Sequence, residues 1–184
     1  MKIEECKISG LLIIEPKIFE DERGQFYETF NLKKFEQITG LNDIVFYQDN
    51  ESISKKNVLR GLHFQNPPFA QGKLVRVTSG RALDIALDIR TGSPTYGQYQ
   101  SILLSSENKK MFWIPPGFAH GFVALEENTK FYYKCTNYYS PESERTIQWD
   151  DSVLNINWDV SDPIISEKDQ KGLDFTTFVS DFQF

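Results

Sequence analysis

The chain has 184 residues, a net charge of −6 and 40% hydrophobic residues. The acidic balance argues against a general nucleic-acid-binding surface, and no apolar run reaches the roughly 18 residues that a membrane span requires. The charged segment at residues 1–10 also lacks the apolar core of a signal peptide. We therefore expect a soluble cytoplasmic protein that forms a single domain over residues 1–184 and has no nucleic-acid or membrane partner.

The two cysteines, Cys6 and Cys135, belong to no close motif. Free thiols in a reducing cytoplasm are therefore expected, and a disulfide framework is not. The 15 Phe, 8 Tyr and 3 Trp residues favour a β-rich architecture and supply surfaces on which flat rings can stack.

Two strands and a turn are predicted in the first 30 residues. Residues 10–19 start as a short apolar strand, but Pro16 makes this stretch either an edge strand or a break between two strands. Residues 21–24 are typical of a turn. Residues 25–30 carry alternating aromatics and therefore predict a second strand.

A short helix is predicted after this strand. Asn31 is a good N-cap, Leu32, Phe35 and Ile38 fall on one helix face, and Gly40 follows the last helical residue. The predicted helix spans about nine residues.

From residue 44 onward the pattern predicts strands almost throughout. Gly, Pro, Asn and Ser clusters separate short apolar runs, and this spacing indicates a sandwich or barrel and not βαβ units. The candidate strands are Ile44–Asn50, Val58–Phe64, Lys73–Ser79, Arg81–Ile89, Gln98–Leu104, Lys110–Ile114, Gly121–Ala124 and Phe131–Thr136.

The pattern becomes irregular beyond Tyr139. Residues 166–169 (SEKD) predict a helix start of the capping-box type, with Asp where Glu is usual. The segment 175–184 contains four phenylalanines. We expect this tail to pack against another surface, for example a neighbouring subunit.

The segment 57–77 holds the candidate functional residues around which the chain is organised. It contains His63, Arg60 and Lys73 inside stretches that otherwise predict buried strand. Burying an unpaired charge is costly, so such residues either form structural pairs or face a cavity. Strand alternation places Arg60 and His63 on opposite faces, although Gly61 permits a bulge that would bring both to one side. A hydrogen-bonded core histidine and a solvated lysine are the structural alternatives.

The histidines do not indicate a metal centre. His63 and His120 are the only two in the chain, so a three-histidine site is excluded, and neither has a second ligand at a short strand spacing. A site of two histidines and a carboxylate stays open, but Lys73 nearby would repel a cation. The Gly-x-Ser-x-Gly motif of a serine nucleophile and glycine-rich phosphate loops are absent. We expect no metal, and proton transfer is the chemistry that these residues suit best.

His120 lies in the segment IPPGFAHGFVAL, whose prolines and glycines restrict the backbone around it. A carboxylate of the LDIALDI strand, Asp84 or Asp88, could orient its ring. Alternation places both carboxylates on the face opposite Ile85, Leu87 and Ile89. That face points either to solvent or into a polar barrel interior.

Tyr133 shares a predicted strand face with Phe131 and Cys135, and Tyr132 takes the other face. A tyrosine that faces a pocket can act as a proton donor, whereas an amphipathic core tyrosine is the more common arrangement.

Seven segments, in register along almost the whole chain to about Asp169, carry a specific resemblance. They are FxDERGxFxExF (19–30), QDNxSxSKKNVLRGLHFQ (48–65), AQGKLVRV (70–77), DIALDIRxxSPTYG (84–97), IPPGFAHGF (114–122), YKCTNYYSPESE (133–144) and SEKD (166–169). The chain resembles the dTDP-4-dehydrorhamnose 3,5-epimerase family.

This resemblance implies an all-β, cupin-type jelly roll that forms a homodimer and needs neither a metal nor an organic cofactor. The implied substrate is the nucleotide sugar dTDP-4-dehydro-6-deoxy-D-glucose, which is inverted at C3 and C5 to dTDP-4-dehydro-L-rhamnose, in the pathway to dTDP-L-rhamnose for surface polysaccharide.

The resemblance also implies residue roles. His63 takes the position of the general base, Asp169 its partner carboxylate, Tyr133 the proton donor and Lys73 the cation at the enolate oxygen. Tyr139 matches an aromatic that stacks on thymine. Further positions associated with substrate contacts are Arg23, Glu28, Gln48, Asn50, Arg60, His120, Glu144 and Lys168. For Asp169, a helix-capping role competes with the catalytic one.

Three alternatives stay open. The first is an epimerase that inverts only one centre, or one that acts on a related 4-keto-deoxysugar nucleotide. The second is a metal-dependent cupin oxygenase, and the third is a sugar-binding module without turnover. The apolar residues Pro67, Pro68 and Phe69 ahead of Lys73 depart from the family pattern and could alter the preferred sugar, and the aromatic tail lies outside it.

Overall fold

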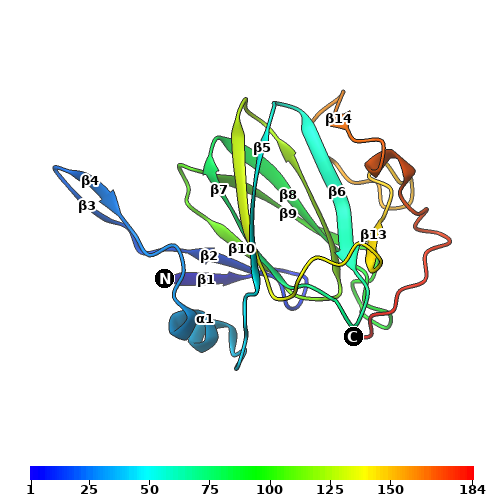
Figure 1. The fold of residues 1–184 in the computed structure, drawn as a ribbon, viewed down its shortest axis with the longest axis horizontal. Helices are drawn as coiled ribbons and strands as arrows, with labels where there is room; N and C mark the ends of the chain where they lie inside the picture. Colours follow the sequence, from blue (N-terminus) through cyan, green and yellow to red (C-terminus); the bar gives the residue numbers. More distant parts are fainter.

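Two β-sheets stacked face to face form the body of the computed structural model, which describes all 184 residues (Figure 1). The first sheet contains, in spatial order, β1 (Lys2–Glu5), β2 (Leu12–Glu15), β10 (Met111–Ile114), β7 (Lys73–Ser79), β12 (Thr129–Cys135) and β5 (Gln48–Ser54). The second contains β13 (Glu144–Thr146), β6 (Val58–Gln65), β11 (Phe118–Ala124), β8 (Arg81–Asp88) and β9 (Tyr99–Ser105), and β14 (Ile164–Ile165) pairs with β6. The prediction of an all-β sandwich or barrel is confirmed.

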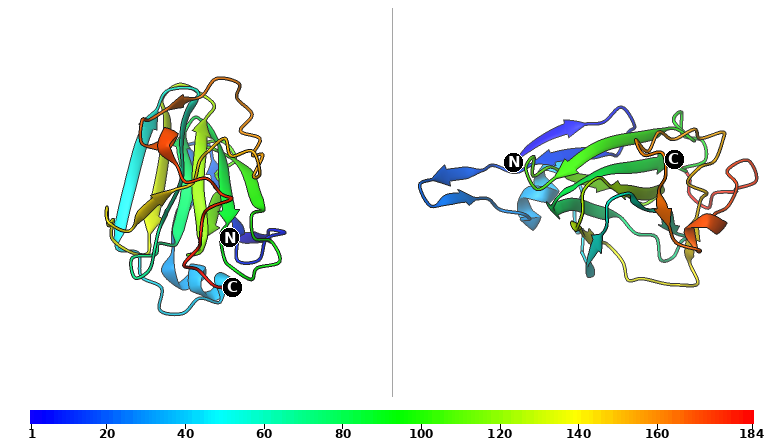
Figure 2. Two further views of the ribbon diagram at one scale, coloured as in Figure 1. Left: turned by 90° about the vertical axis from the view of Figure 1, so that its right-hand side faces the viewer. Right: turned by 90° about the horizontal axis from the view of Figure 1, so that it is seen from above.

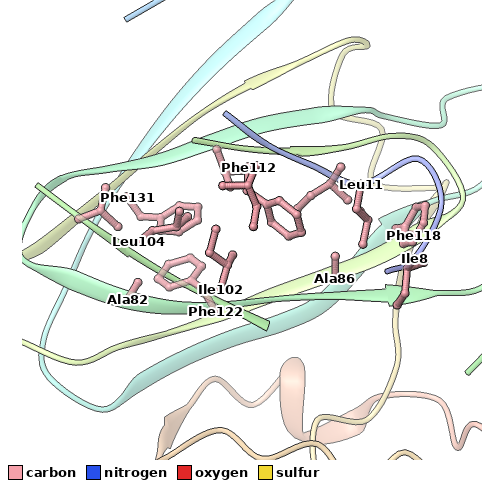
Figure 3. Close-up of a cluster of buried hydrophobic side chains, with 14 residues drawn as sticks. Ile8, Leu11, Ala82, Ala86, Ile102, Leu104, Phe112, Phe118, Phe122 and Phe131 are labelled. Atoms are coloured by element: carbon pink, nitrogen blue, oxygen red, sulfur yellow. The ribbon is translucent and has the colours of Figure 1, made fainter. Parts of the chain in front are cut away.

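The main core lies between the two sheets and follows from strand alternation. Every second residue of β7, β8, β11 and β12 points inward and is apolar over much of each strand. Figure 3 shows these side chains meeting from both sheets, and the rings of Phe122 and Phe131 stack with centroids 3.9 Å apart. This apolar core fills one part of the space between the sheets and leaves another part for polar residues.

The predicted helix is confirmed as α1 (Leu32–Thr39), which covers the outer face of the first sheet. The Asn31 side chain accepts a hydrogen bond from the backbone N–H of Lys34, and Gly40 adopts the left-handed conformation that ends the helix, with φ 70°. Phe35 is buried, and its ring lies edge-on to Trp113 at 5.2 Å. No helix of the chain is long and apolar enough to cross a membrane.

The outer face of the second sheet is covered by the C-terminal part of the chain (Figure 2). Leu59, Ile85 and other outward residues of this sheet pack against Trp158 and Phe182. The backbone N–H of Thr91 donates to the Phe182 carbonyl at 2.8 Å and fixes the end of the tail. The aromatic tail therefore packs against the chain's own sheet, which accounts for Phe175, Phe178 and Phe182 but not for the exposed Phe184.

A hairpin of β3 (Phe19–Asp21) and β4 (Gly24–Phe26) projects from the body as a separate two-stranded sheet (Figures 1 and 2). Pro16 lies in the break between β2 and β3, and residues 22–23 form the turn, as expected. The predicted strand 25–30 is wrong beyond Phe26, because no further strand pairs with the hairpin and the chain turns toward α1.

Three other expectations need correction. β5 begins at Gln48 and not at Ile44, because Ile44 and Phe46 pack beside α1 while residues 48–54 pair with β12. The edge strand β1 is not in the prediction, since its charged residues follow no strand pattern. The predicted helix start at residues 166–169 leads only into the 3₁₀ turn η1 (Asp169–Lys171).

Candidate active site

A bulge in β6 brings two polar residues to the same side of the second sheet. His63 lies opposite His120 in β11, and Arg60 lies opposite Phe122. His120 and Phe122 are two residues apart and point the same way, whereas their partners on β6 are three residues apart, so β6 contains one extra residue beside Gly61. Of the two arrangements considered, the bulge that Gly61 permits is therefore the one observed, and both Arg60 and His63 face inward.

A cavity of about 270 Å³ opens between the two sheets beside the apolar core. Its lining is mostly polar and comes from both sheets and from the loop after β12. The lining residues are Gln48, Asn50, His63, Phe64, Gln65, Gln71, Lys73, Tyr133, Tyr139 and Glu144. The structure thus places His63, Lys73 and Tyr133, three of the four residues expected to carry chemistry, around one cavity.

The fourth, Asp169, lies directly behind His63. Its Oδ1 atom is 2.6 Å from His63 Nε2, and its Oδ2 atom accepts the backbone N–H of Gly61 at 3.3 Å. Burial raises the pKa of the Asp169 carboxyl, but the hydrogen bonds from His63 and Gly61 outweigh this effect and lower the pKa below its ordinary value. The Asp169 side chain does not cap the turn. Ser166 Oγ does so by accepting the Asp169 N–H at 3.1 Å, and the Asp169 carboxylate is left to bind the imidazole.

His120 forms a second histidine–carboxylate pair deeper in the same interior. Its Nε2 atom lies 2.9 Å from Asp84 Oδ2, and both side chains are buried. Burial lowers the pKa of His120 despite the neighbouring carboxylate. Of the two environments considered for the aspartate face of β8, the polar barrel interior is therefore the one observed. Asp88 serves another purpose, since it binds the Arg90 guanidinium.

Lys73 and Tyr133 stand on neighbouring strands of the opposite sheet. Burial lowers the pKa of the Lys73 ammonium, which forms no ion pair and donates only to the His63 carbonyl at 3.5 Å. Burial raises the pKa of the Tyr133 phenol to about 12, so this group keeps its proton at neutral pH. The cavity therefore holds an imidazole, a phenol in its protonated form and an ammonium group without a carboxylate partner.

The cavity rim contains further predicted contact residues. Tyr139 is 51% exposed, and its hydroxyl donates to Glu144 Oε2 at 2.7 Å, while Lys168 forms an ion pair with the same carboxylate. Hydrogen bonds to Lys168 and Tyr139 outweigh burial and lower the pKa of Glu144. Gln48 donates to Asn50 at 2.9 Å on the inner face of β5. These residues form a continuous polar edge around one side of the cavity.

Besides His120 and Lys168, three predicted contact residues lie outside this lining. Arg60 points inward, donates to Ser54 Oγ at 3.3 Å and stabilises the phenolate form of Tyr133 by its charge. Arg23 and Glu28 lie on the projecting hairpin and the segment after it, where Arg23 pairs with Asp21. Within one chain the structure does not bring Arg23 and Glu28 to the cavity.

Phe64, Gln65 and Gln71 line the cavity without having been predicted as site residues. Gln65 could have been found, because it stands two residues after His63 on the same strand and must share its face. Gln71 lies in a loop, where no alternation of residues indicates which way its side chain points. Phe64 belongs to the opposite face of β6, and its position follows only from the three-dimensional packing.

The two histidines do not form part of a metal-binding cluster. No group of three or more His, Cys, Asp or Glu side chains lies together in a way that could hold a metal ion. The Nε2 atom of each histidine faces its own carboxylate, and the charge of Lys73 acts on His120. Both cysteines are free thiols, with Cys135 buried in the interior.

The chain is similar to characterised proteins over almost its full length. A family model described as dTDP-4-dehydrorhamnose 3,5-epimerase matches residues 5–177. An enzyme of that name from Shigella flexneri is 50% identical over 175 residues, which covers 95% of this chain and 96% of the relative.

Two solved structures have the same fold. The crystal structure of dTDP-4-dehydrorhamnose 3,5-epimerase from Elizabethkingia anophelis is 49% identical and superposes with a TM-score of 0.91, covering 96% of this chain and 97% of the other. The dTDP-6-deoxy-D-glucose-3,5-epimerase from Legionella pneumophila, solved in complex with dTDP-4-keto-L-rhamnose, is 51% identical with a TM-score of 0.89, covering 93% and 90%.

The fold, the cavity and these similarities define a cupin-like isomerase of nucleotide sugars. The match extends through both sheets and through the C-terminal segment that carries Asp169. The chain belongs to the dTDP-4-dehydrorhamnose 3,5-epimerase family. The resemblance seen in the sequence and the cupin-type fold class are therefore confirmed.

Proposed function

We propose that this protein inverts C3 and C5 of dTDP-4-dehydro-6-deoxy-D-glucose and forms dTDP-4-dehydro-L-rhamnose, a step toward dTDP-L-rhamnose. The observation that carries this proposal is the placement of His63, Tyr133 and Lys73 around one cavity, with Asp169 2.6 Å from the imidazole. These are the groups that a cofactor-free epimerisation beside a ketone requires.

The chemistry starts from the acidity of the two carbons beside the C4 ketone. Removing a proton from C3 or C5 places negative charge on the C4 oxygen, and a fixed positive charge at that oxygen stabilises the resulting enolate. Lys73 suits this role because it lines the cavity, is only partly exposed and forms no ion pair. Such a group is typically worth about 3 kcal/mol in the transition state.

Inversion requires a base on one face of the sugar and an acid on the other. His63 is the proposed base, and Asp169 stabilises the imidazolium that forms when the base takes a proton. Tyr133 is the proposed acid, since its pKa of about 12 keeps the phenol protonated. His63 belongs to one sheet and Tyr133 to the other, which supports their placement on opposite faces of a sugar bound between the sheets.

The remaining predicted contacts fit a nucleoside diphosphate. Tyr139 presents a half-exposed ring on which a thymine base can stack, and Gln48, Asn50 and Glu144 supply polar contacts in the cavity lining. Lys168 forms an ion pair with Glu144, and His120 lies opposite His63 on the neighbouring strand. Arg60 and Arg23 carry guanidinium groups, which bind phosphates through paired hydrogen bonds.

We also propose that the protein acts as a cytoplasmic homodimer built from single-domain subunits. The projecting hairpin supports this assembly, because Phe19 and Phe26 are 52% and 68% exposed and would be buried against a second copy. A second copy would also account for Arg23 and Glu28, which the hairpin of one chain would carry to the cavity of its partner.

The proposal is tested by incubating the protein with the 4-keto substrate in deuterated buffer and following the products by NMR. Deuterium at both C3 and C5 supports it, deuterium at one carbon indicates a single-centre epimerase, and deuterium at neither rejects turnover and leaves a binding module.

The substitution His63→Ala should lower turnover about 10²–10⁴-fold. Stoichiometric iron or nickel in the purified protein would instead favour an oxygenase.

A further inference from the structure

Gln65 forms an unusually complete set of hydrogen bonds at the cavity wall. Its side chain is 4% exposed and points inward from β6, beside His63. The Nε2 atom donates to the carbonyl of Tyr138 at 3.1 Å and to that of Phe69 at 2.6 Å. The Oε1 atom accepts the backbone N–H of Ser140 at 2.8 Å. One buried amide thus connects two separate loops to a core strand.

Two of these bonds hold the backbone on either side of Tyr139, because Tyr138 and Ser140 are its neighbours in the chain. A second glutamine completes the contact, since Gln48 Oε1 on β5 accepts the Tyr139 N–H at 2.9 Å. The backbone of three consecutive residues is therefore held by side chains from both sheets. The Tyr139 ring itself stays 51% exposed and is fixed at its tip by the hydrogen bond to Glu144.

We infer that Gln65 is a positioning residue for nucleotide binding, which fixes the Tyr139 ring at the cavity mouth before the ligand arrives; this inference rests on the proposed function. A binding group that is already ordered loses less conformational entropy when the ligand binds. Removing the amide would free the loop around Tyr139 without touching the groups proposed to move protons. The effect should therefore fall on binding and not on the chemical step.

The chain is expected to fold without this amide because the two loops have other attachments. Gln71 donates to the Asn137 carbonyl at 2.8 Å, and the Gly72 N–H donates to Thr136 Oγ1 at 2.8 Å. The backbone of Gln65 also stays paired with Glu144 whatever its side chain. The loss is thus confined to the position of Tyr139.

The test uses two substitutions, Gln65→Leu and Gln65→Glu. Leucine removes all three hydrogen bonds at similar volume, while glutamate keeps the acceptor for Ser140 and loses both donors. We expect the dissociation constant of dTDP, measured by calorimetry, and the KM of the sugar nucleotide to rise about tenfold, with kcat within about twofold. Gln100→Leu is the matched control, since Gln100 donates to a backbone carbonyl at 2.9 Å but does not line the cavity.

A double-mutant cycle shows whether Gln65 acts through Tyr139. In a Tyr139→Ala background, Gln65→Leu should cause no further loss of dTDP affinity, whereas an independent role would cost the same in both backgrounds. Should the leucine variant fail to fold, the glutamate variant decides. Unchanged dTDP affinity, or a fall in kcat alone, overturns the inference while leaving the proposed function intact. A wild-type protein that does not bind dTDP rejects both.

Discussion

At the scale of single residues, the carboxylate of Asp169 behind His63 makes the stability of the fold depend on pH. Asp169 is 3% exposed, and its hydrogen bonds lower its pKa below the ordinary value of 3.8. A carboxyl with a lower pKa in the folded state stabilises that state above its unfolded pKa, and this contribution disappears as the pH falls through the folded pKa. Asp169 therefore contributes stability at neutral pH that is lost in acid.

Asp169→Asn should flatten this part of the acid response. We expect the free energy of unfolding of the wild type to fall more steeply than that of the variant below about pH 4, because asparagine does not titrate there. Urea unfolding at a series of pH values measures both curves. Parallel curves would mean that the contact with His63 does not perturb this carboxyl.

Tyr133→Phe should separate proton removal from inversion. The variant lacks the acid on one face, so the enolate is reprotonated from the other face and the configuration returns. Net inversion should fall about 10²–10⁴-fold, while deuterium uptake at the sugar carbons falls less. Tyr132→Phe is the matched control, since Tyr132 points away from the cavity and its hydroxyl bonds Asp49 at 2.7 Å. An equal fall in uptake and inversion would remove Tyr133 from the donor role.

At the scale of elements, sequence periodicity was sufficient wherever a strand followed regular alternation. The inward direction of Lys73, Tyr133 and Cys135 follows from the apolar pattern of their strands. The bulge beside Gly61 was suggested by a glycine but needed the register with β11 to be established. Periodicity carries no information about loops, and so the position of Gln71 could not be predicted.

Contacts between distant segments were harder to predict. The motif containing Asp169 pointed to a catalytic carboxylate, yet residues 166–169 suited a helix cap equally well. Only the packing of the C-terminal segment over the second sheet places the carboxylate beside His63, 106 positions earlier in the chain. The family resemblance supplied this pairing, whereas local pattern could not.

The bulge depends on a close approach of two strands that only glycine permits. Gly61 has φ +122°, and a Cβ atom there would lie 2.6 Å from the Cα atom of Gly121 and 2.7 Å from the carbonyl oxygen of His120. We expect Gly61→Ala to lower the free energy of unfolding by about 3 kcal/mol or more, from backbone strain together with overpacking. Urea unfolding measures this change.

Gly24→Ala separates the two causes of this loss. Gly24 has a similar φ of +118°, but a Cβ atom there would have no neighbour within 4 Å. Its substitution should cost only the backbone strain, about 1–2 kcal/mol. Equal losses at the two positions would show that the approach of β6 to β11 does not constrain the site.

At the scale of the whole molecule, one chain is incomplete with respect to its own predicted site. Arg23 lies on a hairpin that projects away from both sheets, and its side chain is 84% exposed. A homodimer in which each hairpin reaches the partner's cavity would complete two sites at once, as the two-fold symmetry of such assemblies requires. Each site would then take His63 from one subunit and Arg23 from the other.

Mixing two inactive variants tests this arrangement directly. Arg23→Ala and His63→Ala should each have little activity alone. After unfolding and refolding together, half of the dimers should contain one copy of each variant, and each such dimer should have one site with both residues intact. The mixture should therefore recover about a quarter of the wild-type activity. If Arg23 served the cavity of its own chain, every site in the mixture would lack one of the two residues, and no activity would return even with dimers confirmed by sedimentation.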